Sequence, residues 1–434
     1  MQSGSVKIYS TNDTPRLRYI AGIILEDILG LKWEVVGDRR KLGKHPVINY
    51  SNENLAGSFK ITPEALLFEK GVSPKQIEIS EWKGLPAFFQ ASPESDIAFD
   101  VFAASFFLVS RYEEYLEFKP DIHGRFPCKS SVAYKNGFLD KPVVDLWARE
   151  LAKSLLKKFP NLVFKRNEYK ALLTIDTDEA FAHRGKNIFR SIGDLFYDTK
   201  AGLRKANQKY RTIQTEKDPF DVFDYIIDNI AKHDVDARFF FPVGDSSKFD
   251  KNPSWKNDEY RSLINKVSEK FITGLHPSYS AGGDGVMIGT EAKRLKSIIQ
   301  KEINSGRFHY LRLLLPGGYI STLKAGISED YSMGYPDEPG FRAGIARPFY
   351  FYNVIEDKKT ILKVIPFQVM DVTLFEHKKL EPDPAKELIS KMIKETRKAG
   401  GLFVSIWHNT SMLENETGKK GREVFEFLLK NQKP

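Results

Sequence analysis

The sequence predicts an α/β protein in which a (β/α)7 barrel follows a smaller mixed α/β domain. Two observations support this prediction. The chain has 434 residues, more than a single domain usually holds. From Lys170 onward, short apolar runs alternate with segments of helical periodicity, which indicates parallel strands and favours a barrel over an open sheet. A stretch near 160–168 separates the two parts, so we expect domains at 1–165 and 166–434.

The composition indicates a chain with a packed core. Hydrophobic residues make up 41% of the sequence and aromatic residues 13%, which argues against disorder. The net charge of +9 arises from 66 basic and 57 acidic residues that are interspersed, and no DNA- or RNA-binding signature accompanies them. We therefore expect no nucleic-acid partner. The single cysteine, Cys128, excludes an internal disulfide and a cysteine metal cluster.

The sequence carries no targeting signal that we recognise. The N-terminal residues lack the basic and apolar segments of a signal peptide, and no run reaches the ~20 apolar residues that span a bilayer. We therefore expect a cytoplasmic protein, although a chain trimmed of its leader would look the same. The oligomeric state does not follow from the sequence.

The first domain is predicted as strands and helices without a repeat. Thr14 and Pro15 are typical of a helix start, as N-cap and first helical residue, and the apolar residues that follow have helical spacing. Strands are expected at 6–10, 32–37 and 46–51, a further segment at 58–69, and long helices at 96–115 and 144–158.

Charged and aromatic residues crowd together between 110 and 125. One interpretation is a salt-bridged helix end that packs on the second domain. The other is that His123 or Arg125 reaches into the cleft of that domain. The sequence leaves both open.

Strands and helices alternate in the second domain. Strands are expected at 170–176, 237–242, 271–276, 308–314, 329–333, 363–370 and 402–407, and helices at 220–232, 257–270, 290–305, 317–325, 383–399 and 420–430. In such barrels, the functional site lies at the C-terminal ends of the strands. Residues able to bind a metal or move a proton lie at or near most predicted strand ends: Asp176, Asp178, His276, His309, Asp330, Arg342, Asp371 and His408.

Asp176 and Asp178 end the first of these strands, and alternate residues of a strand face the same side. Two carboxylates this close resist simultaneous ionisation unless a cation lies between them or one holds a proton. A metal-binding carboxylate beside a proton-accepting one resolves this conflict. The alternative is a turn in which both side chains bind local amides.

The order of these motifs resembles the polysaccharide deacetylase family (carbohydrate esterase family 4), in a divergent bacterial subgroup with an extra N-terminal module. The motifs are Asp176-Thr-Asp178, Gly274-Leu-His-Pro-Ser278, Phe341-Arg-Ala-Gly344 and the late Trp407-His408, and the resemblance covers about residues 168–430. It implies a distorted barrel that hydrolyses N-acetyl groups of an amino-sugar-containing oligo- or polysaccharide. It also implies one divalent metal ion, with zinc favoured over cobalt or nickel.

Position by position, the resemblance assigns Asp176 as the general base, and Asp178 and His276 as metal ligands. The second histidine of the family's metal motif would fall at Ser280. This leaves the site one ligand short, because zinc takes three protein ligands and an open position. We expect His309 to supply the missing imidazole. Otherwise Ser280 or water takes its place, and metal binding is weak or catalysis is lost.

The remaining roles follow the chemistry of amide hydrolysis. His408 would protonate the departing amine, and Arg342 resembles the family arginine that orients the base. Asp371 lies where the family keeps a supporting carboxylate, but it could equally cap a helix. Trp407 and Tyr335 could stack on sugar rings or belong to the core.

Residues 183–218 form an insertion with an amphipathic stripe and many basic residues. We expect it to pack on the barrel or on the first domain. Alternatives are a lid, or a surface helix in peripheral contact with an anionic membrane.

Three other functions fit parts of the pattern. A glycosyltransferase also uses Asp-x-Asp but leaves His276 and His408 without a role, and the phosphatase motif needs Thr or Val where Ala180 stands. The main alternative is a catalytically inactive, carbohydrate-binding barrel that lost its metal at Ser280. Chelator-sensitive hydrolysis of an acetylated amino sugar would separate the enzyme from this binding protein.

Overall fold

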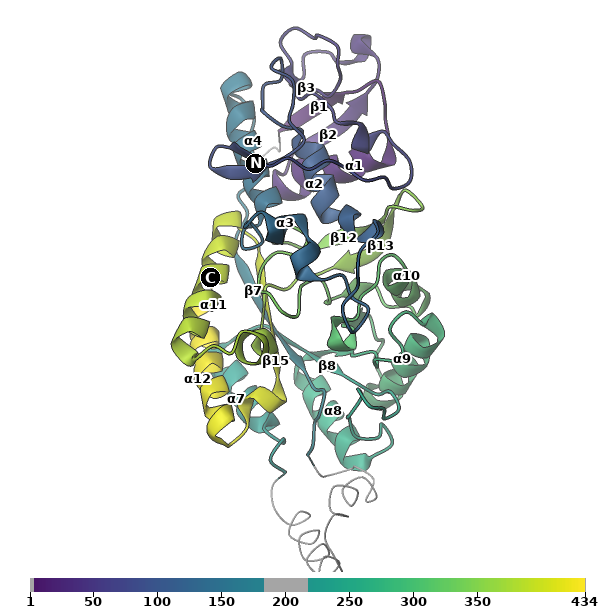
Figure 1. The fold of residues 1–434 in the computed structure, drawn as a ribbon, viewed down its shortest axis with the longest axis vertical. Helices are drawn as coiled ribbons and strands as arrows, with labels where there is room; N and C mark the ends of the chain where they lie inside the picture. The colour runs from purple at the N-terminus through teal and green to yellow at the C-terminus, as the bar shows by residue number, and fades with distance from the viewer. Residues whose placement is uncertain (1–3, 183–217, 434) are drawn as a thin grey trace, which may run out of the picture.

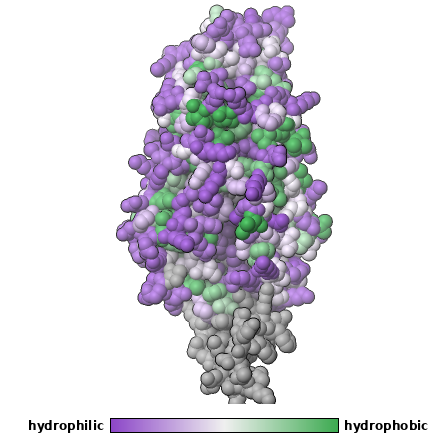
Figure 2. Space-filling view, in the orientation of Figure 1, coloured by the Kyte–Doolittle hydropathy of each residue, from purple (hydrophilic) through white to green (hydrophobic). Residues whose placement is uncertain are grey.

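The computed structural model describes residues 4–182 and 218–433. Figure 1 shows two domains along the long axis of the molecule, with the N-terminal domain at one end. The face drawn in Figure 2 is mainly hydrophilic, with hydrophobic side chains in separate patches. The predicted insertion lies outside the described residues except for Asp218. Within the described ranges, no helix combines the length and hydropathy that a bilayer span requires.

The N-terminal domain is built on a parallel sheet of four strands in the order β2-β1-β3-β4. The strands are β1 (Ser5–Tyr9), β2 (Lys32–Val36), β3 (Val47–Asn49) and β4 (Phe59–Lys60), and β5 (Ser80–Trp82) and β6 (Leu85–Ala87) form a separate hairpin. Helix α1 (Pro15–Ala21) starts as predicted, because Thr14 accepts a hydrogen bond from the Leu17 amide and Pro15 is the first helical residue. The π-helical segment Gly22–Ile28 continues it.

The helix predicted at 96–115 is shorter than expected. Helix α2 covers Val101–Val109 because Asp100 caps it, accepting hydrogen bonds from the amides of Phe102 and Ala103. Beyond its end, Arg111 has a left-handed backbone (φ 55°). Every residue of α2 is buried, so this helix lies in the domain core. Two further helices follow it, α3 (Val132–Lys135) and α4 (Val143–Lys158).

The C-terminal sheet has nine strands in the order β12-β13-β11-β10-β9-β8-β7-β15-β14. Neighbouring strands are parallel except for the antiparallel hairpin of β12 and β13. The strands are β7 (Lys170–Asp176), β8 (Ala237–Phe241), β9 (Ile272–Leu275), β10 (Ser305–Gly306), β11 (Glu329–Asp330), β12 (Phe349–Asn353), β13 (Lys358–Val364), β14 (Val369–Met370) and β15 (Leu402–His408).

This sheet curls into a barrel-like form. Only residues 365–368 separate β13, near one end of the strand order, from β14 at the other end. In this connection, the Phe367 amide donates to the carbonyl of Met333, which follows β11. A backbone hydrogen bond therefore links the segment before β14 to the opposite end of the strand order. The predicted α/β class with a parallel C-terminal sheet is confirmed. The predicted strand 363–370 is two strands, because Pro366 interrupts it and each half pairs with a different neighbour.

The strand predicted at 308–314 is wrong. The strand at this place in the sheet is β10, and the apolar run after it forms a tight turn in which Tyr310 and Leu311 have left-handed backbones (φ 57° and 51°). Such residues cannot continue a strand. Leu311 and Leu313 are instead buried by packing.

Helices cover the sheet close to their predicted positions. They are α7 (Phe223–His233), α8 (Asp258–Lys270), α9 (Gly285–Ile299), α10 (Gly317–Lys324), α11 (Pro382–Ala399) and α12 (Glu416–Asn431). Around the curled sheet, helices α7, α11 and α12 lie on the left of Figure 1, and α8, α9 and α10 lie on the right. Helix α9 starts earlier than expected because Asp284 caps it, accepting from the amides of Val286 and Met287.

Buried ion pairs join the two domains. Arg342 donates to both carboxylate oxygens of Glu114, at 2.9 and 2.7 Å, and Arg111 also donates to Glu114. Burial alone would raise the pKa of Glu114, but Arg342 and Arg111 outweigh it and hold that pKa below its ordinary value. The interpretation of the 110–125 stretch as a salt-bridged helix end that packs on the second domain is therefore confirmed for Arg111 and Glu114.

Candidate metal and catalytic site

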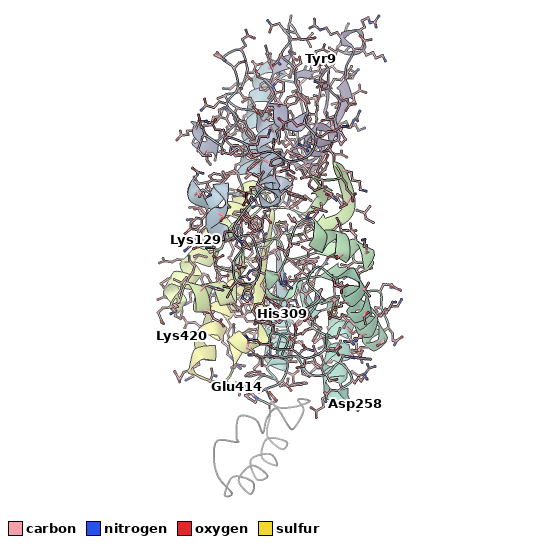
Figure 3. All side chains as sticks on the ribbon, turned by 45° about the vertical axis from the view of Figure 1, so that its right-hand side comes forward. Tyr9, Lys129, Asp258, His309, Glu414 and Lys420 are labelled. Atoms are coloured by element: carbon pink, nitrogen blue, oxygen red, sulfur yellow. The ribbon has the colours of Figure 1, made fainter. Side chains whose placement is uncertain are left out.

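Most of the chemically active side chains predicted from the sequence meet at the C-terminal ends of the barrel strands, and Arg342 does not. Asp176 is the last residue of β7 and pairs in register with His408, the last residue of β15. Asp178 follows β7, and His276 follows β9. His309 lies in the turn after β10, and Figure 3 shows it inside the C-terminal domain, between the two groups of helices.

Asp178, His276 and His309 form a group that could hold a divalent metal ion. Nε2 of His276 lies 3.0 Å from Asp178 Oδ1, and Nε2 of His309 lies 3.3 Å from Asp178 Oδ2. One ligand atom from each of the three side chains lies within 4.8 Å of the others. Catalytic zinc sites combine three such protein ligands with an open position, so this donor set suits a divalent cation.

Hydrogen bonds determine which nitrogen each imidazole presents. Nδ1 of His276 lies 2.5 Å from the backbone carbonyl of Arg307, which can only accept, so Nδ1 carries the proton in the neutral ring. Nδ1 of His309 lies 3.0 Å from Asp250 Oδ1. This carboxylate oxygen also accepts a hydrogen bond, so Nδ1 of neutral His309 carries the proton as well. In both neutral rings, Nε2 then offers a lone pair on the side of Asp178.

One buried oxygen of this group, Asp178 Oδ1, has no hydrogen-bond donor when His276 is neutral. It faces His276 Nε2, which in the neutral ring is itself an acceptor. Two acceptors in contact are unfavourable unless a cation lies between them. A divalent ion would satisfy both atoms at once, so the residues fit the metal that the sequence predicts.

The electrostatics of the group also favour positive charge. Burial lowers the pKa of His309, but Asp178 and Asp250 outweigh burial and raise it to about 9. Burial opposes ionisation of Asp178 as well, yet His309 and His276 hold its pKa well below the ordinary value. A divalent ion that displaces the proton of His309 would be attracted by the same two carboxylates, Asp178 and Asp250.

Arg307, and not Arg342, holds Asp176. Its Nη1 donates to Asp176 Oδ1 at 2.7 Å, while its other nitrogens donate to the Thr174 hydroxyl and the Tyr331 carbonyl. The structure therefore corrects the role predicted for Arg342. Arg342 instead donates to Glu114 of the first domain, and local sequence patterns cannot reveal a partner from another domain.

Sequence reasoning missed two residues of this site. Arg307 lies two positions before His309, and a charged residue within that mostly apolar run is a signal that could have identified it. Asp250 lies in the loop after β8, where nothing in the local pattern marks it. It is buried and accepts hydrogen bonds from the Ser247 hydroxyl and the Tyr279 amide.

His408 and Asp371 form a buried pair beside the two aspartates. Nδ1 of His408 lies 2.7 Å from Asp371 Oδ1, and the His408 amide donates to Asp371 Oδ2. Nε2 lies 3.9 Å from Asp176 Oδ2 and 3.7 Å from Asp178 Oδ2. Burial lowers the pKa of His408, but these carboxylates, with Asp371 first, raise it to about 10. The ring is therefore protonated at neutral pH and can donate a proton from Nε2.

The other predicted residues lie away from this cluster. Ser280 is exposed, and His309 completes the triad in its stead. Trp407 is fully buried in the core. Tyr335 is buried at the domain interface, where its ring lies against the guanidinium of Arg342. Neither aromatic ring is available to stack on a sugar.

Comparisons with known proteins concern the two domains separately. Residues 6–160 match a family described as "Family of unknown function (DUF7033)". A search of curated proteins found no match. A protein classified as a polysaccharide deacetylase from Mycobacterium smegmatis is 14% identical, with a TM-score of 0.40 over 61% of this chain and 84% of that one.

Two further solved structures are similar. A CE4 family pseudoenzyme from Bacillus anthracis is 11% identical, with a TM-score of 0.32 over 62% of this chain and 64% of that one. The polysaccharide deacetylase Bc1974 from Bacillus cereus is 12% identical, with a TM-score of 0.30 over 61% of this chain and 86% of that one. The chain is thus structurally similar to CE4 polysaccharide deacetylases over about 60% of its length.

Proposed function

We propose that this protein is a metal-dependent deacetylase that hydrolyses N-acetyl groups on an amino-sugar-containing oligo- or polysaccharide. The supporting observation is that three candidate metal ligands, a carboxylate and a protonated histidine lie in one cluster. Amide hydrolysis needs a polarised carbonyl, an activated water molecule and a proton for the leaving nitrogen. The cluster contains one group for each of these tasks.

Zinc is the proposed ion, with cobalt or nickel as alternatives, because two imidazoles and a carboxylate suit these metals. Held by Asp178, His276 and His309, the ion would polarise the acetyl carbonyl and lower the pKa of a water molecule. Asp250 would keep His309 in the tautomer whose Nε2 is free.

Asp176 is the proposed general base. Arg307 occupies its Oδ1, which leaves Oδ2 to accept a proton from the attacking water. The 3.9 Å between Asp176 Oδ2 and His408 Nε2 is too long for a hydrogen bond. The proposed base, Asp176, and the proposed acid, His408, are therefore close together but form no hydrogen bond with each other.

His408 is the proposed general acid. Asp371 holds Nδ1, so that the proton to be transferred lies on Nε2, on the side of the two aspartates. The proton passes from Nε2 to the nitrogen of the departing amino sugar as the C–N bond breaks. Asp371 stabilises the charged ring before that step and keeps its orientation fixed afterwards.

Acetate release from N-acetylglucosamine oligomers tests this proposal. Zinc-loaded protein should release acetate, a chelator should abolish the release, and added zinc should restore it. Asp176→Asn should lower kcat by about 10²- to 10⁴-fold while zinc remains bound. The control is Asp258→Asn, at the exposed start of α8 (Figure 3), which should change nothing.

An inactive carbohydrate-binding protein is the alternative. It would bind the same oligomers but release no acetate in the presence of zinc, cobalt or nickel. That result would contradict the proposed activity.

A further inference from the structure

The N-terminal domain contributes a loop, Asp121–Arg125, to the edge of the metal site. Nη1 of Arg125 donates to the Tyr310 carbonyl at 2.5 Å. In return, Nε of Arg312 donates to the His123 carbonyl at 3.2 Å. The first domain therefore holds the segment that directly follows the third candidate metal ligand, and the second interpretation of the 110–125 stretch also has support.

Four rings from separate segments pack together beside this loop: His123, Phe249, Tyr279 and Tyr310, which we call the aromatic wall. Phe249 and Tyr279 are stacked, with ring centroids 4.1 Å apart. The ring of His123 lies 4.9 Å from that of Tyr310, and its Nδ1 lies 3.2 Å from the Tyr279 hydroxyl. The aromatic wall is thus one packed surface to which both domains contribute.

The aromatic wall adjoins the candidate metal ligands directly. The ring of Tyr310 lies 4.6 Å from the ring of His309, which lies 4.9 Å from the ring of His276. Asp250, which holds His309, also accepts a hydrogen bond from the Tyr279 amide. A molecule that reaches the metal ligands from this side therefore has aromatic surface beside it.

Several parts of this region remain open to solvent. Tyr310 keeps 37% of its surface exposed, although its left-handed backbone (φ 57°) is a conformation that tyrosine rarely adopts. The other three rings are partly exposed. In the loop, Ile122 is 93% exposed, so folding gives this apolar side chain no burial. Strained backbone and exposed apolar surface beside a reactive cluster are features of a binding surface.

We propose that the loop Asp121–Arg125 and the aromatic wall form a saccharide subsite, which binds the sugar next to the one whose N-acetyl group reacts. Aromatic rings pack against the apolar C–H faces of sugars. Phe249 and Tyr279 stack on each other and carry Lys248 and Arg312 over their rings, so the exposed ring of Tyr310 is the one that offers a face to the sugar. The two cations can donate to sugar hydroxyls. The N-terminal domain thereby makes the site prefer an oligomer to a single sugar. This inference rests on the proposed function for the class of ligand.

Calorimetric titration of zinc-loaded, full-length protein with N-acetylglucosamine, from monomer to tetramer, tests the subsite. Every protein in the titration also carries Asp176→Asn, because this change leaves zinc bound and slows hydrolysis of the oligomer. Wild type should bind the tetramer more tightly than the monomer. In the double variant Ile122→Ala/His123→Ala, the affinity for the tetramer should fall about tenfold, while monomer affinity and zinc content stay unchanged. His123→Phe in the wild-type background keeps an aromatic ring and should retain tetramer binding.

The matched control is His45→Ala/Ile361→Ala, because both residues are exposed and lie outside the loop and the aromatic wall. It should behave as wild type. Thermal unfolding should show that every variant is folded at the temperature of the titration, because the double variant loses only the exposed Ile122 side chain and the contacts of the half-buried His123 ring.

Two results would overturn the subsite: equal binding of monomer and tetramer by wild type, or unchanged tetramer affinity in the double variant. A separate result bears on the activity. If wild type releases no acetate but the double variant still loses tetramer affinity, the subsite is supported and the deacetylase function is contradicted.

Discussion

Arg307 Nη1 donates a 2.7 Å hydrogen bond to Asp176 Oδ1 in the interior of the barrel, and the Arg307 side chain is fully buried. Thr174 and Tyr331 hold the remaining nitrogens, so Arg307 has one orientation. Its guanidinium also lies over the ring of Phe240, at 4.6 Å. The proposed base is therefore oriented before any substrate arrives, which is the preorganisation that catalysis exploits.

Arg307→Lys should lower kcat by about 10²-fold or more while one zinc per chain remains bound. Lysine keeps the charge but cannot bind Asp176, Thr174 and Tyr331 at once. Steady-state kinetics and elemental analysis of the same preparation check this. Arg342→Lys is the control, because it changes a buried arginine outside the site, and its kcat per folded molecule should stay near wild type. Equal losses in both variants would contradict the assignment.

His309→Ala should abolish stoichiometric zinc binding, as should Asp178→Ala and His276→Ala. Each change leaves two protein ligands where a catalytic zinc site uses three. Elemental analysis after dialysis measures the metal per chain. Ser280→Ala is the control, because this exposed serine lies outside the triad. A full complement of zinc in His309→Ala would show that another group completes the site.

Asp250→Asn should weaken zinc affinity by about 10- to 100-fold without removing a ligand. Asparagine can present an amide where His309 Nδ1 needs an acceptor, so the imidazole is less firmly held in the tautomer that binds metal. Competition with a chelator of known affinity measures the change. Asp245→Asn is the control, since this exposed aspartate in the same loop contacts Arg294 and not the triad. Unaltered affinity in Asp250→Asn would exclude the supporting role.

The site could be predicted from the sequence where strand position alone determines it. Asp176 and His408 end adjacent parallel strands, and the C-terminal ends of such strands meet at one edge. The partners of these residues could not be predicted in the same way. Arg342 received the wrong role because its carboxylate, Glu114, comes from the other domain. Asp250 reaches the site through a loop whose path depends on tertiary packing.

Asp371→Asn should move the basic limb of the pH–activity profile to lower pH. Burial lowers the pKa of His408, and Asp371 is the main group that raises it to about 10. A proposed acid must be protonated, so activity falls as pH rises through this pKa. Without the carboxylate charge that pKa decreases, and the limb should shift by about one pH unit or more. Profiles of kcat for the two proteins measure the shift, and coincident basic limbs would remove His408 as the acid.

Arg342→Ala should destabilise the protein by about 3 kcal/mol, because it leaves Glu114 buried with only Arg111 to balance its charge. The effect should depend on pH in a defined direction. The pKa of folded Glu114 is below its ordinary value of 4.5, so the wild-type ion pair stabilises the fold fully above pH 4.5. That contribution is lost as pH falls through the folded pKa, and the two proteins should converge in acid. Urea unfolding at pH 7 and near pH 3 measures both differences, with the exposed Glu26→Gln as control. A constant difference across this range would show that Arg342 stabilises the interface by packing rather than by charge.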